Sequence, residues 1–250
     1  MIKLKELIYF YDDKKALDSI SFSVDSGEKV ALLGANGSGK STLLRVLAGL
    51  YFLNKGEYWF KNRLITKKSV NRDFRKEVAI LFQNPDSMII SPTVFDEIAF
   101  SLREFDFDNI DSRVKDIAQK FGIMELLEYN PLNLSGGQKQ KVILASLMVY
   151  EPNLLLLDEP TSAMDPKTTG WFIDTILDID KCVLLATHDL ALAYETCDRA
   201  IVIDENHKII YDGDIEELFK DLELLERANL IHKHKHKHKN FMHSHYHLHY

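Results

Sequence analysis

The chain has 250 residues, 46% of them hydrophobic and 28% charged, which is typical of a folded globular protein and excludes wholesale disorder. The formal net charge is −7, and the last twenty residues carry four lysines and no acid, so the remainder holds 27 basic against 38 acidic residues. An acidic body argues against a general nucleic-acid binder, and we expect no nucleic-acid partner.

The sequence also lacks the usual signs of membrane insertion or export. The longest mostly apolar run, Val142 to Tyr150, has nine residues, whereas a membrane-spanning helix needs roughly 18. The first residues, MIKLKEL, scatter charges where a signal peptide would be apolar. We therefore expect a cytosolic protein that meets a membrane only through a partner. Cys182 and Cys197 are expected to be reduced in that compartment.

From Ile2 to about Tyr58, short β-type runs alternate with turn signals. Val30 to Leu33 predicts a buried strand, which leads through a glycine-rich turn into a helical pattern from Ser41 to Leu50. The turn matches the P-loop pattern without departure, and its strand-to-helix context is the one that pattern requires. The expected phosphate-binding residues are Gly34, Asn36, Gly37, Ser38, Gly39, Lys40, Ser41 and Thr42.

These residue types suit a nucleotide phosphate. Glycines let backbone N–H groups approach an anion closely, and the N-terminus of the following helix adds a favourable field. We expect Lys40 to reach the β- and γ-phosphates and the Ser41 hydroxyl to bind Mg²⁺. The alternative is a glycine-rich turn that binds no ligand.

From about Asp86 to Met148 the pattern becomes mostly helical, with apolar residues at helical spacing around Val114 and again after Ser135. Within this stretch lies Leu134-Ser135-Gly136-Gly137-Gln138. Ser135 and the two glycines are expected to open a helix whose free N–H groups form a second anion site.

Two further apolar runs predict strands of a parallel sheet that is covered on both faces, Leu154 to Leu157 and Val183 to Ala186. The first ends in Asp158 and Glu159, at the strand end where open α/β sheets bind ligands. We expect Asp158 to orient the Mg²⁺ shell and Glu159 to polarise the attacking water.

Taken together, the sequence from Ile2 to about Leu218 resembles the ATP-binding-cassette ATPases, whose signature is the Leu134–Gln138 pentapeptide. The resemblance implies that Gln83 senses the γ-phosphate and Mg²⁺, and that His188 contacts the γ-phosphate. It also implies that Tyr11 stacks on adenine, with packing as the alternative role. The segment Ser162–Asp165 resembles the loop that crosses to the partner.

The resemblance further implies a head-to-tail dimer with a second cassette, identical or paralogous, in which each ATP lies between one P-loop and the opposite signature. One departure is Lys141, where many relatives have arginine, so a bidentate contact there is in question. The expected fold is α/β, a P-loop NTPase core with a parallel sheet, an N-terminal antiparallel β part and an inserted helical subdomain at about 86–148. The cassette spans 1–230.

This pattern favours the ATPase subunit of a membrane transporter, peripheral on the cytoplasmic face and bound to integral membrane subunits. A soluble cassette ATPase is the alternative; such relatives generally show two cassettes or long coiled-coil insertions, and this chain has neither. Phe82 to Val94, followed by Asp96–Phe100, resembles the energy-coupling-factor group, which serves vitamin, cobalt and nickel uptake, although Ser87–Ile89 departs from it. Met88, Ile89 and Ile90 are either groove residues for a membrane subunit or ordinary core.

Residues 231–250 are rich in histidine and are expected to form a flexible tail. Neutral imidazole binds nickel, cobalt, zinc and copper, which favours a nickel or cobalt transporter over a vitamin transporter. The intervening lysines should weaken metal binding, and a solvated tail or a purification tag are the alternatives. The candidate ligands are His232, His234, His236, His238, His243, His245, His247 and His249.

Overall fold

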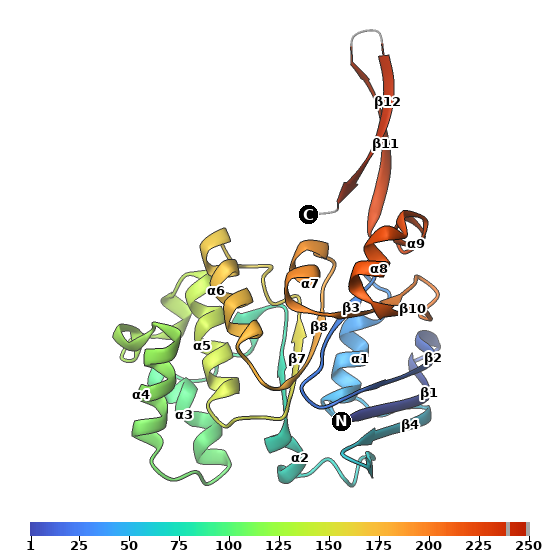
Figure 1. Ribbon diagram of the computed structural model, residues 1–250. Coiled ribbons are helices and arrows are strands. Elements are labelled where there is room, and N and C mark those ends of the chain that lie inside the picture. Colours follow the sequence, from blue (N-terminus) through green and yellow to red (C-terminus); the bar gives the residue numbers. More distant parts are fainter. Residues whose placement is uncertain (239–240, 249–250) are drawn as a thin grey trace. The chain divides into compact units, whose positions relative to one another are not determined.

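The computed structural model describes the backbone of residues 1–238 and 241–248, and the side chains of residues 1–231. The chain forms two compact units, one made of Met1–Lys67 with Cys182–Tyr250 and the other of Lys68–Lys181. Both contain strands and helices, which confirms the predicted α/β class (Figure 1).

The first unit begins with an antiparallel sheet in the order β2-β1-β4-β5, the predicted N-terminal β part. Ile2, Leu4 and Leu7 of the first strand are buried, because alternate side chains of a strand share one face. Glu6, with φ of 47°, interrupts this alternation, and the register shifts there. The strands are β1 (Ile2–Tyr11), β2 (Lys14–Val24), β4 (Lys55–Phe60) and β5 (Arg63–Leu64).

A second sheet in this unit contains β10, β9, β3 and β8 as successive neighbours. The central strand β3 pairs in parallel with both β8 and β9, and Val30–Leu33 are fully buried, as their apolar run predicts. The strands are β3 (Lys29–Leu33), β8 (Cys182–Ala186), β9 (Arg199–Ile203) and β10 (Ile209–Asp214). The helices are α1 (Lys40–Leu47), α7 (Leu190–Thr196), α8 (Ile215–Lys220) and α9 (Leu222–Arg227).

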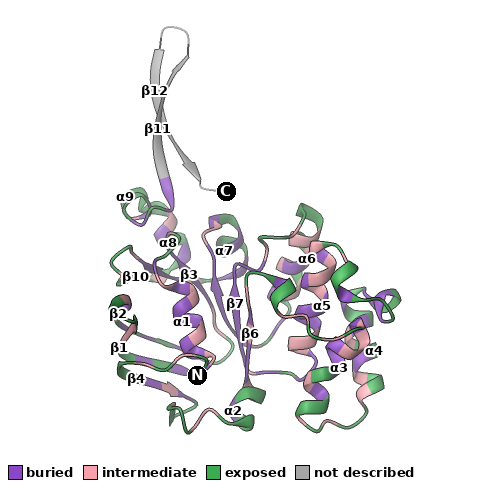
Figure 2. Cartoon of the chain, turned by 180° about the vertical axis from the view of Figure 1, so that it is seen from behind, coloured by how far each residue is buried: buried purple, intermediate pink, exposed green. Residues whose placement is uncertain are grey.

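In the second unit two parallel strands, β6 (Val78–Leu81) and β7 (Leu154–Asp158), pair with Leu81 opposite Leu157. Figure 2 shows both strands buried along most of their length. The helix α5 contacts β6 and the helices α3 and α4. The helices are α2 (Arg72–Glu77), α3 (Val94–Glu104), α4 (Ile110–Phe121), α5 (Gly136–Met148) and α6 (Pro166–Leu177), with short 3-10 turns η1 (Pro85–Ser87), η2 (Met124–Leu126) and η3 (Pro131–Asn133).

The backbone of the histidine-rich segment forms an antiparallel pair, β11 (Ile231–His238) with β12 (Phe241–Leu248). The candidate metal ligands from His232 onward lie outside the residues whose side chains are described, and His249 also lies outside the described backbone. The predicted metal role of this segment therefore stays a prediction.

The sequence predicts that both cysteines are reduced. Cys182 and Cys197 are both unpaired and buried, and burial raises the pKa of each thiol to about 12, so both stay protonated near neutral pH.

Within residues 1–238 and 241–248, no helix is both long and apolar enough to cross a membrane.

Candidate functional site

The turn between β3 and α1 has the geometry of an anion cradle. Gly34, Gly37 and Gly39 have φ of 149°, 84° and 111°, a region that residues with a Cβ rarely adopt. A Cβ on Gly34 would collide with the carbonyl oxygen of Ile203, and one on Gly39 with that of Ala16. No side chain caps the start of α1. This stretch of backbone thus has no Cβ at three positions and no capping side chain at the helix start, so a phosphate can approach its N–H groups.

Lys40 bends back over this turn. Its side chain is buried, and Nζ donates to the carbonyl oxygen of Gly34 at 2.6 Å and to that of Ala35 at 3.2 Å. The ammonium group is therefore held above the same loop that presents the glycines. A fixed positive charge at this point suits the phosphate contact that the sequence predicts for Lys40.

Ser38 and His207 form a feature that sequence reasoning missed. A ring nitrogen of His207, Nδ1, lies 3.0 Å from the carbonyl oxygen of Ser38 in the P-loop. The backbone of His207 also accepts a hydrogen bond from the amide of Asp18 at 3.0 Å. Ser38 Oγ is buried and has no hydrogen-bond partner among the described residues. His207 lies in no motif, so no sequence signal could have placed it beside the loop.

Tyr11, at the end of β1, lies beside the P-loop helix. Its hydroxyl is 3.2 Å from Thr42 Oγ1, and 39% of the residue is exposed. Its ring makes edge contacts with Tyr9 and Tyr51, with ring centroids 5.1 and 5.7 Å apart. Tyr9 and Tyr51 stack on each other at 5.4 Å. The partly exposed ring expected to meet adenine is thus supported by two tyrosines that the sequence did not single out.

His188 follows β8 and is half-buried. Since β8 runs parallel to β3 with Ala186 opposite Leu32, His188 and the P-loop leave the sheet at the same edge. The flanking residues are fixed: the amide of Thr187 donates to the carbonyl oxygen of Leu32 at 3.2 Å, and Asp189 caps α7. In the first unit, Tyr11 therefore lies beside the P-loop helix, and His188 lies at the same edge of the sheet as the P-loop.

In the second unit Asp158 and Glu159 stand at the end of β7, with 3% and 8% of their surface exposed. Glu159 has φ of 47°, a conformation that costs energy in a residue other than glycine and that is common at functional sites. Gln83 is exposed and follows β6, which pairs with β7 in parallel. Gln83, Asp158 and Glu159 thus leave their two strands at the same edge.

The signature residues begin α5, as predicted, but they are not all free. Ser135 Oγ accepts from the amide of Gln138 at 3.4 Å, and Gln138 Oε1 accepts from the amide of Ser135 at 3.0 Å. This capping box occupies the amide of Ser135, one of the three that we expected to be open, together with the amide of Gln138, and it leaves those of Gly136 and Gly137 outside the box. The expectation of an uncapped second anion site is corrected to this extent.

The loop Ser162–Asp165 lies against the signature within this unit. A Cβ on Gly136 would come 2.7 Å from the carbonyl oxygen of Ala163, and one on Gly137 would come 2.9 Å from Thr168 Oγ1. Asp165 caps α6 by accepting from the amide and the hydroxyl of Thr168, both at 3.0 Å, and these bonds lower the pKa of Asp165. Small residues at both glycine positions are therefore needed for this contact.

The three residues that follow the signature, Lys139 to Lys141, differ in their surroundings. Lys141 lies over the ring of Trp171, with Nζ 4.4 Å from the centroid, so a cation–π contact stands where a bidentate arginine was in question. Gln140 is fully buried, and neither amide atom has a partner among the described residues. Lys139 forms an ion pair with Asp86 at 2.7 Å.

The segment after Gln83 divides between core and surface. Met88 and Ile89 are half-buried, whereas 64% of Ile90 is exposed. The buried carboxylate of Glu97 accepts from the amides of Ile90 and Ser91 at 3.0 and 2.8 Å. Glu97 therefore fixes the backbone that presents Ile90 to solvent.

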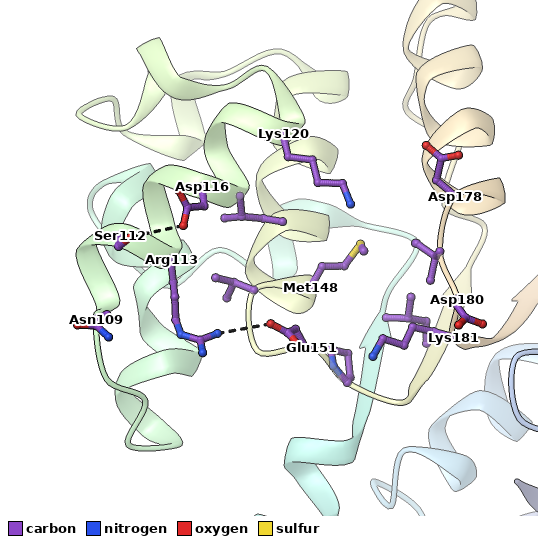
Figure 3. Close-up of a pocket in the computed structure, with 15 residues that line it drawn as sticks. Asn109, Ser112, Arg113, Asp116, Lys120, Met148, Glu151, Asp178, Asp180 and Lys181 are labelled. Carbon is purple, nitrogen blue, oxygen red and sulfur yellow. Dashed lines mark hydrogen bonds and ion pairs between the residues drawn. The ribbon is translucent and has the colours of Figure 1, made fainter.

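A cavity of about 760 Å³ lies elsewhere in the second unit, along α4 and the ends of α5 and α6 (Figure 3). Arg113 of α4 pairs with Glu151 at 3.5 Å, and Ser112 donates to Asp116 at 3.4 Å. None of the motif residues lines this cavity, so it is not the predicted nucleotide site. Among residues 1–231, no group of three or more His, Cys, Asp or Glu is arranged to hold a metal ion.

Comparison with known proteins agrees with these motifs. The family described as ABC transporter matches residues 17–162. A protein of Methanosarcina acetivorans, provisionally described as an ABC transporter ATP-binding protein, is 39% identical over 244 residues, covering 92% of this chain and 88% of that protein. The energy-coupling factor transporter ATP-binding protein EcfA of Methanothermobacter thermautotrophicus is 35% identical, covering 92% and 76%. The solved structure of cbiO1 from Clostridium perfringens, part of the ABC transporter complex cbiONQ, has a TM-score of 0.79 and 32% identity, covering 92% and 94%.

Proposed function

Because the chain belongs to the ABC transporter family, whose ATP-binding domains hydrolyse ATP, we propose that it is the ATPase subunit of an energy-coupling-factor importer. The observation that carries the nucleotide role is the cradle at Gly34–Lys40, which only glycines can form at its positive-φ positions and which holds a buried ammonium above it. The likeness to an energy-coupling factor ATPase supports the transporter type.

Different residues are proposed for phosphate binding, Mg²⁺ binding and proton transfer. Lys40 and the P-loop amides would bind the phosphates, and Ser41, Gln83 and Asp158 are the residues that would hold Mg²⁺. MgATP, when bound, supplies the phosphoanhydride bond that is cleaved. Glu159 accepts a proton from the water whose oxygen attacks the γ-phosphorus, and ADP leaves with the bridging oxygen.

His188 and Tyr11 complete the site at its two ends, one at the γ-phosphate and the other at the adenine ring. The signature residues Ser135 to Gln138 bind the nucleotide of a second cassette, identical or paralogous, in a dimer. The dimer docks on integral membrane subunits at the cytoplasmic face, with the exposed Ile90 among the contacts.

Two substitutions test the ATPase assignment. Lys40→Ala should weaken nucleotide binding, because the ammonium meets the phosphates in the ground state. Glu159→Gln should preserve binding and lower turnover by at least about a hundredfold, since it removes only the base. Nucleotide affinity and steady-state hydrolysis are measured for both variants. Normal hydrolysis by Glu159→Gln would refute the assignment of Glu159 as the base.

The proposed cargo is a nickel or cobalt ion, and the support is compositional: eight of the ten histidines lie after Leu230. A vitamin importer is the second candidate. Truncation after Leu230 should abolish Ni²⁺ or Co²⁺ binding in calorimetry and preserve MgATP hydrolysis. Binding to the full chain should fade below about pH 6, because protons compete for imidazole. Equal Ni²⁺ uptake by both proteins, or none by either, would refute the metal role and favour the vitamin importer.

A further inference from the structure

An ion pair connects two segments that are far apart in the sequence but adjacent in the second unit. Asp86 lies in η1, three residues after Gln83, and Lys139 lies one residue after the signature glutamine Gln138. Lys139 Nζ is 2.7 Å from Asp86 Oδ1. The lysine side chain is only 14% exposed, whereas the aspartate is 54% exposed. The lysine side chain is therefore mostly buried, and its ammonium group meets a carboxylate that is open to solvent.

The Asp86 end of the pair is tied to Gln83 by a compact turn. Asn84 Oδ1 accepts from the amide of Asp86 at 3.0 Å, and the Asn84 carbonyl accepts from the Ser87 hydroxyl at 2.7 Å. On the other side of Gln83, the amide of Phe82 donates to Met88 Sδ at 3.3 Å. The residues before and after Gln83 are thus both bound to the turn that carries Asp86, which ties the backbone of Gln83 to that of Asp86.

The Lys139 end is tied to the signature in the same way. The amide of Lys139 donates to the carbonyl oxygen of Ser135 at 2.9 Å, which closes the first turn of α5. Gln138 closes the capping box with Ser135. The signature, Lys139, the ion pair and the turn beside Gln83 thus form one continuous series of contacts.

We propose that the Asp86–Lys139 ion pair couples the two nucleotide sites of the dimer. Gln83 acts on the nucleotide bound by its own chain, and the signature acts on the nucleotide of the partner, so this inference rests on the proposed function. An ion pair with one exposed partner adds little to the free energy of unfolding. Its proposed effect is therefore on the relative position of the two segments that carry Asp86 and Lys139. Asp86 and Lys139 are positioning residues, and they touch no reacting atom.

Coupling between two sites is measured as cooperativity. The full-length chain should hydrolyse MgATP with a Hill coefficient clearly above one. Asp86→Asn and Lys139→Gln should each lower the coefficient towards one, while the maximal rate stays within about threefold of the original. The charge-swapped double variant, Asp86→Lys with Lys139→Asp, should recover much of the cooperativity, because it restores an attractive pair.

Arg113→Gln is the matched control, since it breaks the Arg113–Glu151 ion pair of the same unit without touching either segment. It should leave the Hill coefficient unchanged. A wild-type coefficient near one, unchanged coefficients in the single variants, or failure of the swap to recover cooperativity would each overturn the coupling role. Absence of hydrolysis by the wild-type chain would instead refute the proposed function, so the two failures are distinguishable.

Discussion

The two regions that we propose to face phosphate are both helix N-termini, yet they are built differently. The P-loop helix α1 begins after Gly39 with no side-chain cap and is preceded by three glycines at positive φ. The signature helix α5 begins at a serine that closes a capping box with Gln138. The first region is shaped by its backbone, whereas the second satisfies its own amides with side chains.

This difference indicates how each region meets a nucleotide. The P-loop can accept a phosphate without first breaking a side-chain cap, so it suits tight binding within one chain. At the signature, a phosphate oxygen that approaches the Ser135 hydroxyl or amide must compete with the capping box. Contact with a partner's nucleotide should therefore be weaker and easier to reverse.

The largest expected effect tests the backbone of the P-loop. Gly34→Ala should lower the free energy of unfolding by about 3 kcal/mol or more, because φ of 149° disfavours a Cβ that would also meet Ser38 Oγ at 2.8 Å. Urea denaturation without nucleotide measures this. Gly170→Ala is the control: its Cβ would meet nothing within 4 Å, and it should stabilise α6 by about 0.5–1 kcal/mol. Equal effects at both glycines would contradict the account of the P-loop.

A smaller effect tests the cap of the signature helix. Ser135→Ala removes the oxygen that accepts from Gln138 and should cost about 1 kcal/mol, while Ser135→Thr should keep most of the stability. Thr93→Ala, which removes the comparable cap of α3, sets the scale within the same unit. Stability of Ser135→Ala equal to that of the wild type, with a clear loss in Thr93→Ala, would mean that the capping box is not formed in solution.

The third expected effect is similar in size and has the opposite sign. Gln140 buries an amide without a partner among the described residues, and such a group costs about 1–3 kcal/mol. Gln140→Met should therefore raise the free energy of unfolding by about 1 kcal/mol. Gln119→Met, on the exposed face of α4, should change it by less than about 0.5 kcal/mol. Destabilisation by Gln140→Met would show that the amide is hydrogen bonded in solution.

Much of this arrangement could be predicted from local sequence. The apolar runs Val30–Leu33 and Val183–Ala186 form buried parallel strands, because continuous apolar runs of that length suit a sheet covered on both faces. The helix predicted from Ser41 to Leu50 ends earlier, at Leu47, because Gly49 adopts φ of 70°. The glycine pattern of the P-loop gave the correct turn because each glycine is required by its own backbone angle.

The long-range contacts could not be predicted in this way. His207 is 169 residues from Ser38, and Asp86 is 53 residues from Lys139, so no periodicity or motif connects either pair. The capping box was readable from Ser135 and Gln138, since a serine followed three residues later by glutamine is its signature. The prediction of free N–H groups at the signature did not take into account that the side chains of Ser135 and Gln138 bind backbone amides there.

The most direct test of the central claim is the nucleotide-dependent association of two cassettes. Glu159→Gln with MgATP should elute from a sizing column as a dimer, and the same protein without nucleotide should be largely monomeric. Adding Ser135→Arg should abolish the dimer, because bulk and charge then fill the surface that faces the partner's nucleotide. A dimer that forms regardless of ATP and of Ser135 would contradict the claim that the P-loop and the signature of opposite chains share one nucleotide.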